Sequence, residues 1–427
     1  MSSKSPLPDA PVVVAPPELR LSIAADRPDA VYGIGERAVF RLHAAHGGAP
    51  DDGGEIAWTL SRDGVPPLEK GTAVPRGGVV EISGTLAEPG FLRCEATWRR
   101  AGQECAVAAG AAFEPFRIGP SLPLPDDFDA FWDERLRALA AVPVDVQLTP
   151  PPRRAEGIDV DDVQVGCLGQ PVRGYFARPA GAAPGTLPAI VTLHGAGVYD
   201  SDFDAAAGWA RAGFLALDIN AHGLPNGRGK DFYAHHNETT LKDYRTRGRE
   251  SREAVYHAGM FLRVRRALDF LASRPEWDGR TLVCYGGSQG GAQALAGAGL
   301  DPRVSFVFAG VPAMCDHTGM VAGRIAGWPK LVPVDADGAP DLAVREASRY
   351  VDGVNFAARV RGEAFFSVGF SDAVCPPTGV LAAYNRIAGP KGIFLEVGCG
   401  HEILQRVWDE ARRRVLAHAA CRPPLPS

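Results

Sequence analysis

The stretch TLVCYGGSQGGAQAL, residues 281–295, restricts most strongly how this 427-residue chain can fold. An apolar run enters it, glycines surround Ser288, and an alanine-rich run that favours a helix follows. A phosphate-binding loop is also rich in glycine, but it needs a lysine that this stretch lacks. Small residues on both sides of a serine permit a sharp turn that lifts its hydroxyl above a sheet. The stretch therefore predicts a strand, a tight turn that exposes Ser288, and a helix.

Around this turn, strand-like apolar runs alternate with helical patterns over residues 118–421. The later runs are apolar on both faces, as a parallel sheet covered by helices on both sides requires. The patterns indicate helices near residues 126–142, 203–212, 251–274, 289–299 and 403–419. We therefore predict an α/β domain with a mostly parallel eight-stranded sheet, followed by a tail at 422–427.

Residues 18–117 have a different character. Short alternating runs are separated by Gly, Pro and Asp turn signals about every ten residues. This spacing predicts a small all-β sandwich of immunoglobulin type, preceded by a flexible N-terminus at 1–17. The simplest interpretation of this sandwich is an accessory domain with a structural or docking role. Carbohydrate binding is the alternative, because Trp58 or Trp98 could stack on sugars.

Composition excludes several classes of function. The net charge of −5 is small, and no basic stripe is interleaved with aromatic residues, so the chain does not resemble a nucleic-acid or membrane-surface binder. The chain has no apolar run of 18 residues and no segment typical of a signal peptide, so we expect a cytoplasmic protein.

The eight cysteines are scattered, without a CxxC motif and without the Cys/His spacing of a zinc site. We therefore predict no metal site and interpret the cysteines as mostly reduced and buried. Cys94 and Cys105 flank an expected hairpin turn, so a disulfide across that turn is the alternative.

Two later strands end in residues that could activate a serine. The run EAFFSVGF is followed by Ser371 and Asp372, and the run GIFLEVG is followed shortly by His401. Ligands collect at the carboxyl ends of strands in this architecture, and a serine nucleophile needs an imidazole base oriented by a carboxylate. The order Ser288, Asp372, His401 is that of one large class of hydrolases. The competing interpretation is that Asp372 caps a turn and His401 caps the last helix.

Backbone donors are also needed, because the tetrahedral intermediate carries an oxyanion. We expect one donor to be the N–H of Gln289 and the other that of Ala196, with Gly195 and Gly197 as alternatives. The histidines at two earlier strand ends, His194 and His222, are expected to form pocket walls or loop hydrogen bonds. A polar loop is expected to hold His235 and His236.

Several blocks together resemble the acetyl xylan esterase and cephalosporin C deacetylase family, the seventh family of carbohydrate esterases. They are GGSQGGAQALAGAGLDPRV, GVPAMCDH, GFSDAVCPPTGVLAAYN and the final GHE, and the likeness covers about residues 120–420. The resemblance implies an α/β-hydrolase that removes acetyl groups from small sugars or oligosaccharides without a cofactor. It also implies a catalytic triad of Ser288, Asp372 and His401, with the oxyanion donors named above.

Members of this family often assemble as oligomers and are often secreted, so a homo-oligomer and export both stay open. This chain departs from the family at three places. Where members carry an R-G-Q block, it has DINAHGLPNG, with His222 and Gly223; Ala196 stands where many members have Tyr; and the sandwich is absent from short members. The fold and triad therefore transfer better than the substrate does.

Two further functions fit parts of the sequence. A peptidase of the prolyl-oligopeptidase kind shares the serine turn and residue order. It needs a propeller or acidic residues that hold a peptide amine, and a sandwich of about 100 residues is too short for a propeller. A catalytically inactive sugar-binding protein is the other alternative, and the presence of all three triad residues argues against it.

Overall fold

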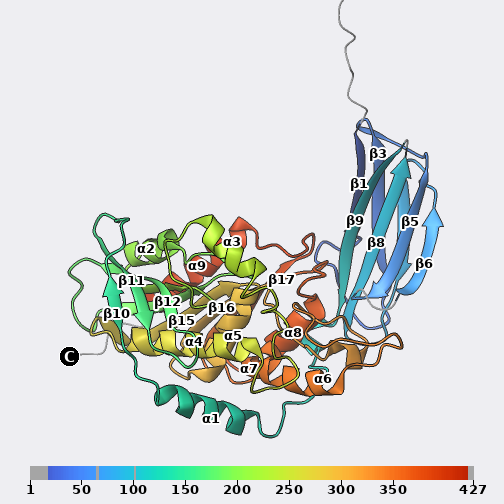
Figure 1. Ribbon diagram of the computed structural model, residues 1–427. Coiled ribbons are helices and arrows are strands. Elements are labelled where there is room, and N and C mark those ends of the chain that lie inside the picture. The colour runs from blue at the N-terminus through green and yellow to red at the C-terminus, as the bar shows by residue number, and fades with distance from the viewer. Residues whose placement is uncertain (1–17, 64–66, 101, 422–427) are drawn as a thin grey trace, which may run out of the picture.

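The computed structural model describes residues 18–63, 67–100 and 102–421, so the predicted N-terminus (1–17) and C-terminal tail (422–427) lie outside the described residues. The strands of two small sheets fall between Leu19 and Phe113, and those of one large sheet between Gln147 and Glu396. Figure 1 shows the small sheets standing beside the large α/β part, next to α8 (Pro377–Arg386) and α6 (Leu342–Ser348).

The two small sheets form a β-sandwich. One consists of β1 (Leu19–Ala25), β3 (Ala38–His46), β4 (Ala49–Pro50) and β7 (Val79–Gly84). The other has the order β2 (Val31–Tyr32), β9 (Gln103–Phe113), β8 (Gly90–Arg100), β5 (Glu55–Arg62) and β6 (Pro67–Ala73). Alternate side chains of both sheets are buried in the core, among them Phe40, Leu42, Ile56 and Leu60. This alternation is what the sequence pattern predicted; the immunoglobulin type stays a prediction.

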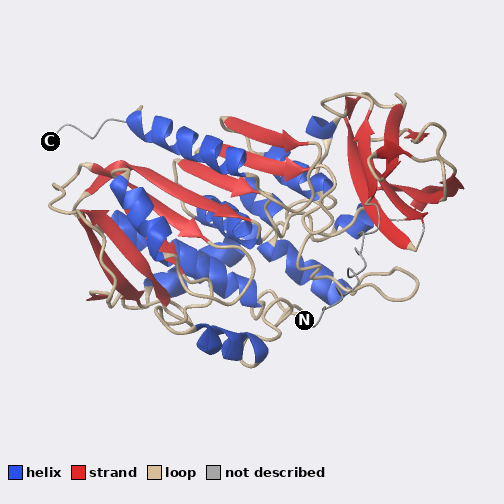
Figure 2. Cartoon of the chain, turned by 90° about the horizontal axis from the view of Figure 1, so that it is seen from above, coloured by secondary structure: helices blue, strands red, loops and turns tan. Residues whose placement is uncertain are grey.

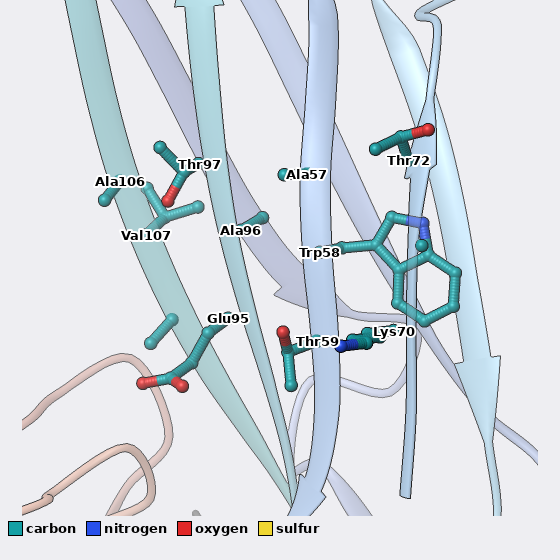
Figure 3. A pocket seen from close by; sticks show the side chains of 12 residues that line it. Ala57, Trp58, Thr59, Lys70, Thr72, Glu95, Ala96, Thr97, Ala106 and Val107 are labelled. Atoms are coloured by element: carbon teal, nitrogen blue, oxygen red, sulfur yellow. The ribbon is translucent and has the colours of Figure 1, made fainter. Parts of the chain in front are cut away.

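The tryptophans of the sandwich differ in their surroundings. Trp98 is fully buried and its indole N–H donates to the carbonyl of Gly53 at 3.0 Å, so the hypothesis that it stacks on sugars is wrong. Trp58 is partly buried and lies against the backbone of Gly71. A hollow of about 950 Å³ lies over β9, β8, β5 and β6 and is lined mainly by small side chains. Figure 3 shows the side chains that line it.

The large sheet has nine strands rather than the eight predicted. Its order is β10 (Gln147–Thr149), β11 (Ile158–Val165), β12 (Val172–Pro179), β14 (Leu215–Ile219), β13 (Leu187–Leu193), β15 (Trp277–Gly287), β16 (Phe306–Gly310), β17 (Glu363–Gly369) and β18 (Lys391–Glu396). The additional strand, β10, is a short and exposed edge strand, so it carries no apolar signal. The first three pairings are antiparallel and the other five are parallel.

Helices cover both faces of this sheet (Figures 1 and 2). The remaining α-helices are α1 (Phe128–Ala140), α2 (Phe203–Arg211), α3 (Lys230–Glu238), α4 (Tyr256–Ala272), α5 (Gln289–Leu300), α7 (Gly353–Ala357) and α9 (Gln405–Ala420). Side chains of α2 and α9 pack with Val283 and Tyr285 of β15, whereas those of α4 and α5 pack with Leu282 and Cys284. Both faces of β15 are thus buried, as its unbroken apolar run requires.

One local expectation was wrong. His235 and His236 lie in helix α3, not in a polar loop. The segment KDFYAHHNE contains neither Gly nor Pro, and its one buried side chain, Tyr233, donates to the carbonyl of Pro225 at 2.8 Å. A single buried anchor gives no helical periodicity, so the helix is hard to recognise in the sequence.

The disulfide considered between Cys94 and Cys105 is absent. Both cysteines are free, and in the β8–β9 register Cys94 lies opposite Ala109 while Cys105 lies opposite Trp98. The two thiols are therefore displaced along the hairpin. Across the described part of the chain, no helix is both long and apolar enough to cross a membrane.

Asp218 is a buried carboxyl in the large sheet. It accepts hydrogen bonds from the Thr192 hydroxyl at 2.6 Å and from the backbone N–H of Asp202 at 2.7 Å, and Asp202 caps helix α2. Burial raises the pKa of Asp218 to about 7. The carboxyl therefore keeps its proton in the folded chain at pH values where an unfolded aspartate has lost it.

We expect the Asp218→Asn variant to differ from the wild type in how its stability depends on pH. As pH rises from about 4 to about 7, the Asp218 carboxyl loses its proton in the unfolded chain but keeps it in the folded chain. The free energy of unfolding of the wild type therefore falls by up to about 1.4 kcal/mol per pH unit relative to the variant. Urea unfolding at several pH values measures this difference. The exposed Asp133→Asn variant is the control, and parallel profiles for Asp218→Asn and the wild type would contradict the prediction.

Candidate active site

Ser288 lies in a strained turn between β15 and α5. Its backbone has φ 54° and ψ −122°, a conformation that residues other than glycine rarely adopt. A Cβ on Gly290 would lie 2.0 Å from the carbonyl oxygen of Leu193, and one on Gly286 would lie 2.5 Å from that of Gly290. Only glycine fits at both positions, so the sequence prediction of a sharp turn around Ser288 is confirmed.

The three residues predicted at strand ends form one chain of hydrogen bonds. The Ser288 Oγ lies 3.0 Å from Nε2 of His401, and Nδ1 of His401 lies 2.8 Å from Oδ2 of Asp372. Asp372 follows β17 and is buried, whereas His401 follows β18 and is exposed. The hydroxyl, the imidazole and the carboxylate are therefore arranged for transfer of the serine proton to the imidazole.

The competing interpretation of these residues is partly right for Asp372 and wrong for His401. Oδ1 of Asp372 accepts from the N–H groups of Val374 and Cys375, both at 2.8 Å, so this carboxylate does cap a turn. The other carboxylate oxygen, Oδ2, faces Nδ1 of His401. The N-cap of α9 is Leu404, so His401 does not cap that helix.

The expected oxyanion donors lie on two segments next to Ser288. Gln289 is the first residue of α5, and its buried side chain accepts a hydrogen bond from the Tyr244 hydroxyl at 3.1 Å. Ala196 lies in the loop between β13 and α2. The residue before it, Gly195, lines the same cavity as Ser288. The assignment of the donating N–H groups to Ala196 and Gln289 stays a prediction.

The loop that contains Ala196 is held by the block that departs from the family pattern. The imidazole of His222 is hydrogen-bonded through Nε2 to the carbonyl of Gly197 at 3.0 Å and through Nδ1 to the Tyr256 hydroxyl at 2.9 Å. The Asn220 amide donates to the carbonyl of Tyr199 at 2.7 Å. Burial lowers the pKa of His222 to about 3, so the ring is neutral and Nε2 is the donor to Gly197.

His194 forms a second connection between the same two segments. Its Nε2 accepts from the N–H of Ala221 at 3.0 Å, so Nδ1 carries the proton and faces the carbonyl of Gly195 at 2.7 Å. Burial lowers the pKa of His194 to about 4 and keeps this ring neutral. The expectation that His194 and His222 make loop hydrogen bonds is confirmed.

A cavity of about 430 Å³ opens at Ser288. Its lining consists of Leu193, His194, Gly195, Gly287, Ser288, Val311, His401, Glu402, Ile403 and Trp408. Ile403 and Trp408 lie over Gly287, where a Cβ would be 2.4 Å from Ile403 Cδ1. These two wall residues were not predicted, although their closeness to His401 in the sequence was a signal.

Asp372, Cys375 and His401 offer three potential metal ligands within 4.8 Å of one another. The geometry fits a metal ion poorly. Both oxygens of Asp372 already accept hydrogen bonds, one of them from His401, and burial raises the pKa of the Cys375 thiol well above its usual value. A protonated thiol is a weak ligand, so we derive no metal chemistry from this group.

Comparison with known proteins gives a consistent result. The Acetyl esterase Axe7A of Xylanibacter ruminicola is 32% identical over 372 residues, which cover 85% of this chain and 82% of that protein. An acetyl xylan esterase structure from Paenibacillus sp. R4 is 29% identical and has a TM-score of 0.61, covering 71% of this chain and 98% of that one.

A second solved structure shows the same fold. Acetyl Xylan Esterase 1 from Thermoanaerobacterium sp. JW/SL YS485 is 23% identical with a TM-score of 0.57, again covering 71% of this chain and 98% of that one. The sequence profile described as Acetyl xylan esterase (AXE1) matches residues 117–418. With its α/β-hydrolase fold and the strand-end constellation around Ser288, the chain belongs to the acetyl xylan esterase family.

Proposed function

We propose that this protein is a serine esterase that removes acetyl groups from the hydroxyls of sugars or small oligosaccharides. The observation that carries the proposal is the chain of hydrogen bonds from Ser288 through His401 to Asp372, at the mouth of a cavity. Two relatives, one an acetyl esterase and the other an acetyl xylan esterase, support the acetyl group as the acyl part.

In this proposal, Nε2 of His401 accepts the Ser288 proton while Oγ attacks the ester carbonyl carbon. The N–H groups of Ala196 and Gln289 donate to the oxyanion that forms. His401, oriented by Asp372, then returns the proton to the leaving sugar oxygen, and an acetyl-enzyme is formed. A water molecule that gives one proton to His401 attacks the carbonyl carbon of this ester. His401 then returns that proton to the leaving Ser288 Oγ, so the serine hydroxyl is restored and acetic acid is released, which ionises to acetate. Apart from the ester substrate and this water, every group named in these steps belongs to the chain.

A peptidase of the prolyl-oligopeptidase kind is the weaker candidate. The strands before the catalytic part form two packed sheets and not the repeated blades of a propeller. An assay that sets proline-containing peptides against acetylated mono-, oligo- and polysaccharides separates the two activities, and release of acetate from the sugars is the outcome expected here.

We expect Ser288→Ala to lower turnover of p-nitrophenyl acetate by about 10⁶-fold, because loss of the nucleophile removes the acyl-enzyme route. Ser251→Ala, which removes a hydroxyl from a turn outside the cavity, should retain wild-type turnover. A fluorophosphonate should label the wild type once and leave Ser288→Ala unlabelled. Retention of most activity by Ser288→Ala would refute the proposed function.

The cavity wall predicts how the enzyme selects acyl groups. Ile403 lies beside Ser288 and limits the space over Gly287. We expect Ile403→Ala to raise kcat/KM for butyrate over acetate esters by at least about tenfold, because even one added methylene that fits an apolar pocket is worth roughly 1–3 kcal/mol. Ile158→Ala, in β11, should leave this ratio unchanged, and an unchanged ratio in Ile403→Ala would show that Ile403 does not limit the acyl group.

Assembly as a homo-oligomer is part of the proposal. Val321, Val334 and Leu342 are large aliphatic residues that are exposed on the stretch of chain between β16 and α7, as residues at subunit contacts often are in an isolated chain. Light scattering behind a sizing column should give a mass that is a multiple of 45.2 kDa, and Leu342→Asp should lower it. A monomeric mass for the wild type would exclude the oligomer.

A further inference from the structure

The sandwich contacts the segment that carries the proposed catalytic acid. This segment, residues 370–376, joins β17 to α8 and is called the acid loop below. Among the described sandwich residues, Phe91 and Arg93 of β8 and Gly110 of β9 contact it. All three lie on the same outer face of the sheet that carries the hollow in Figure 3, at the end nearer the α/β part.

Two backbone carbonyls of the acid loop rest on this face. The Arg93 guanidinium donates through Nη1 to the carbonyl of Ser371 at 2.5 Å, across 278 positions of sequence. Gly110 lies directly opposite Arg93 in the β8–β9 register, and a Cβ there would lie 2.2 Å from the carbonyl oxygen of Phe370. Arg93 thus supplies a hydrogen-bond donor, and Gly110 has no side chain that would block the approach. The carbonyls of Phe370 and Ser371 can therefore lie close to the sheet.

An apolar contact lies beside the hydrogen bond between Arg93 and Ser371. The rings of Phe91 and Phe370 meet edge to face with centroids 5.0 Å apart, and both side chains are buried. Arg93 is only 8% exposed, so its bond to Ser371 is shielded from water. A charged donor bound to a carbonyl in such surroundings is stronger than an exposed one, and its loss leaves a buried acceptor unpaired.

Charged groups from the sandwich also face the acid. Arg93 pairs with the half-exposed carboxylate of Glu95 at 3.0 Å. Asp63, which follows β5 and is 3% exposed, lies close enough to Arg93, Arg324 and Asp372 to interact with their charges. Burial raises the pKa of Asp63 well above its usual value, which disfavours a second negative charge next to Asp372.

We propose that Arg93 is a positioning residue for the esterase reaction, and that the sandwich acts on catalysis by holding the acid loop through Arg93 and Gly110. This inference rests on the proposed function, in which Asp372 orients His401. Besides its contact with His401, the Asp372 carboxylate accepts from two N–H groups of the acid loop itself, those of Val374 and Cys375. Its position next to His401 depends on how this loop is held, by Arg93 on the sandwich side and by the Cys399 carbonyl, which accepts from Ser371, on the other. A shift of the Ser371 carbonyl therefore moves the Asp372 carboxylate away from Nδ1 of His401.

The first test replaces the donor. We expect Arg93→Gln to lower kcat on p-nitrophenyl acetate by about 10- to 100-fold, because a displacement near 1 Å at a catalytic group costs up to about 10² in rate. KM should stay within about twofold, since Arg93 does not line the substrate cavity. Arg93→Lys keeps a cationic donor and should recover part of the lost kcat. Arg99→Gln, at the exposed far end of the same strand, is the matched control and should behave as the wild type.

Activity is referred to the number of reactive serines, titrated with a fluorophosphonate, so that a partly unfolded sample is not mistaken for a slow enzyme. A fall in kcat per titrated site at unchanged KM supports the inference. An unchanged kcat per titrated site in Arg93→Gln overturns it, whether or not the number of sites falls. Because Ser288→Ala tests the function separately, an inactive Ser288→Ala together with a fully active Arg93→Gln would reject this inference alone.

The second test moves the loop from the opposite strand. Gly110→Ala places a methyl group against the Phe370 carbonyl and should lower kcat per titrated site in the same direction as Arg93→Gln. Gly33→Ala is the control in the same sandwich, because its added Cβ meets no atom closer than 3.6 Å. Wild-type kcat in a folded Gly110→Ala protein would contradict the proposed seat for the acid loop.

Discussion

The unfavourable backbone conformation of Ser288 is the constraint on which the rest of this structure depends. A non-glycine residue at such angles costs on the order of 1–3 kcal/mol, so its surroundings must hold it there. The Ser288 N–H donates to the carbonyl of Gly310 at 2.8 Å, and its own carbonyl accepts from the N–H groups of Ala292 and Ala313. Strand β16, helix α5 and the segment after β16 are thereby tied to one residue.

This arrangement explains why much of the site could be predicted from the sequence. A strand that ends in a glycine-flanked serine fixes which edge of the sheet is functional, and parallel strands deliver their following residues to that same edge. Asp372 and His401 were recognisable because each comes soon after a strand, and the order of the three matches a known hydrolase order. The alternation in residues 18–117 likewise predicted a sandwich.

The parts that escaped prediction are contacts between distant segments. Arg93 and Ser371 are 278 positions apart, and nothing in either neighbourhood marks them as partners. Trp98 looked available for a ligand because the sequence does not show which face of a strand is inward. The helix of His235 and His236 has one buried anchor, Tyr233, and so lacks periodicity. In each case the outcome depends on a tertiary contact, and the local sequence pattern carries no information about such contacts.

Burial across the joint between the two parts has a consequence for how the protein can be divided. Buried residues of the sandwich and of the catalytic part belong to one continuous apolar core, and Asn385 of α8 donates to the carbonyls of Pro115 and Ile118 in the connecting segment. A chain cut before residue 118 would expose Phe370 and free the Ser371 carbonyl. In such a fragment the acid loop lacks its contacts with the sandwich. A low activity of the fragment on a polymer would therefore not show whether the sandwich binds polysaccharide.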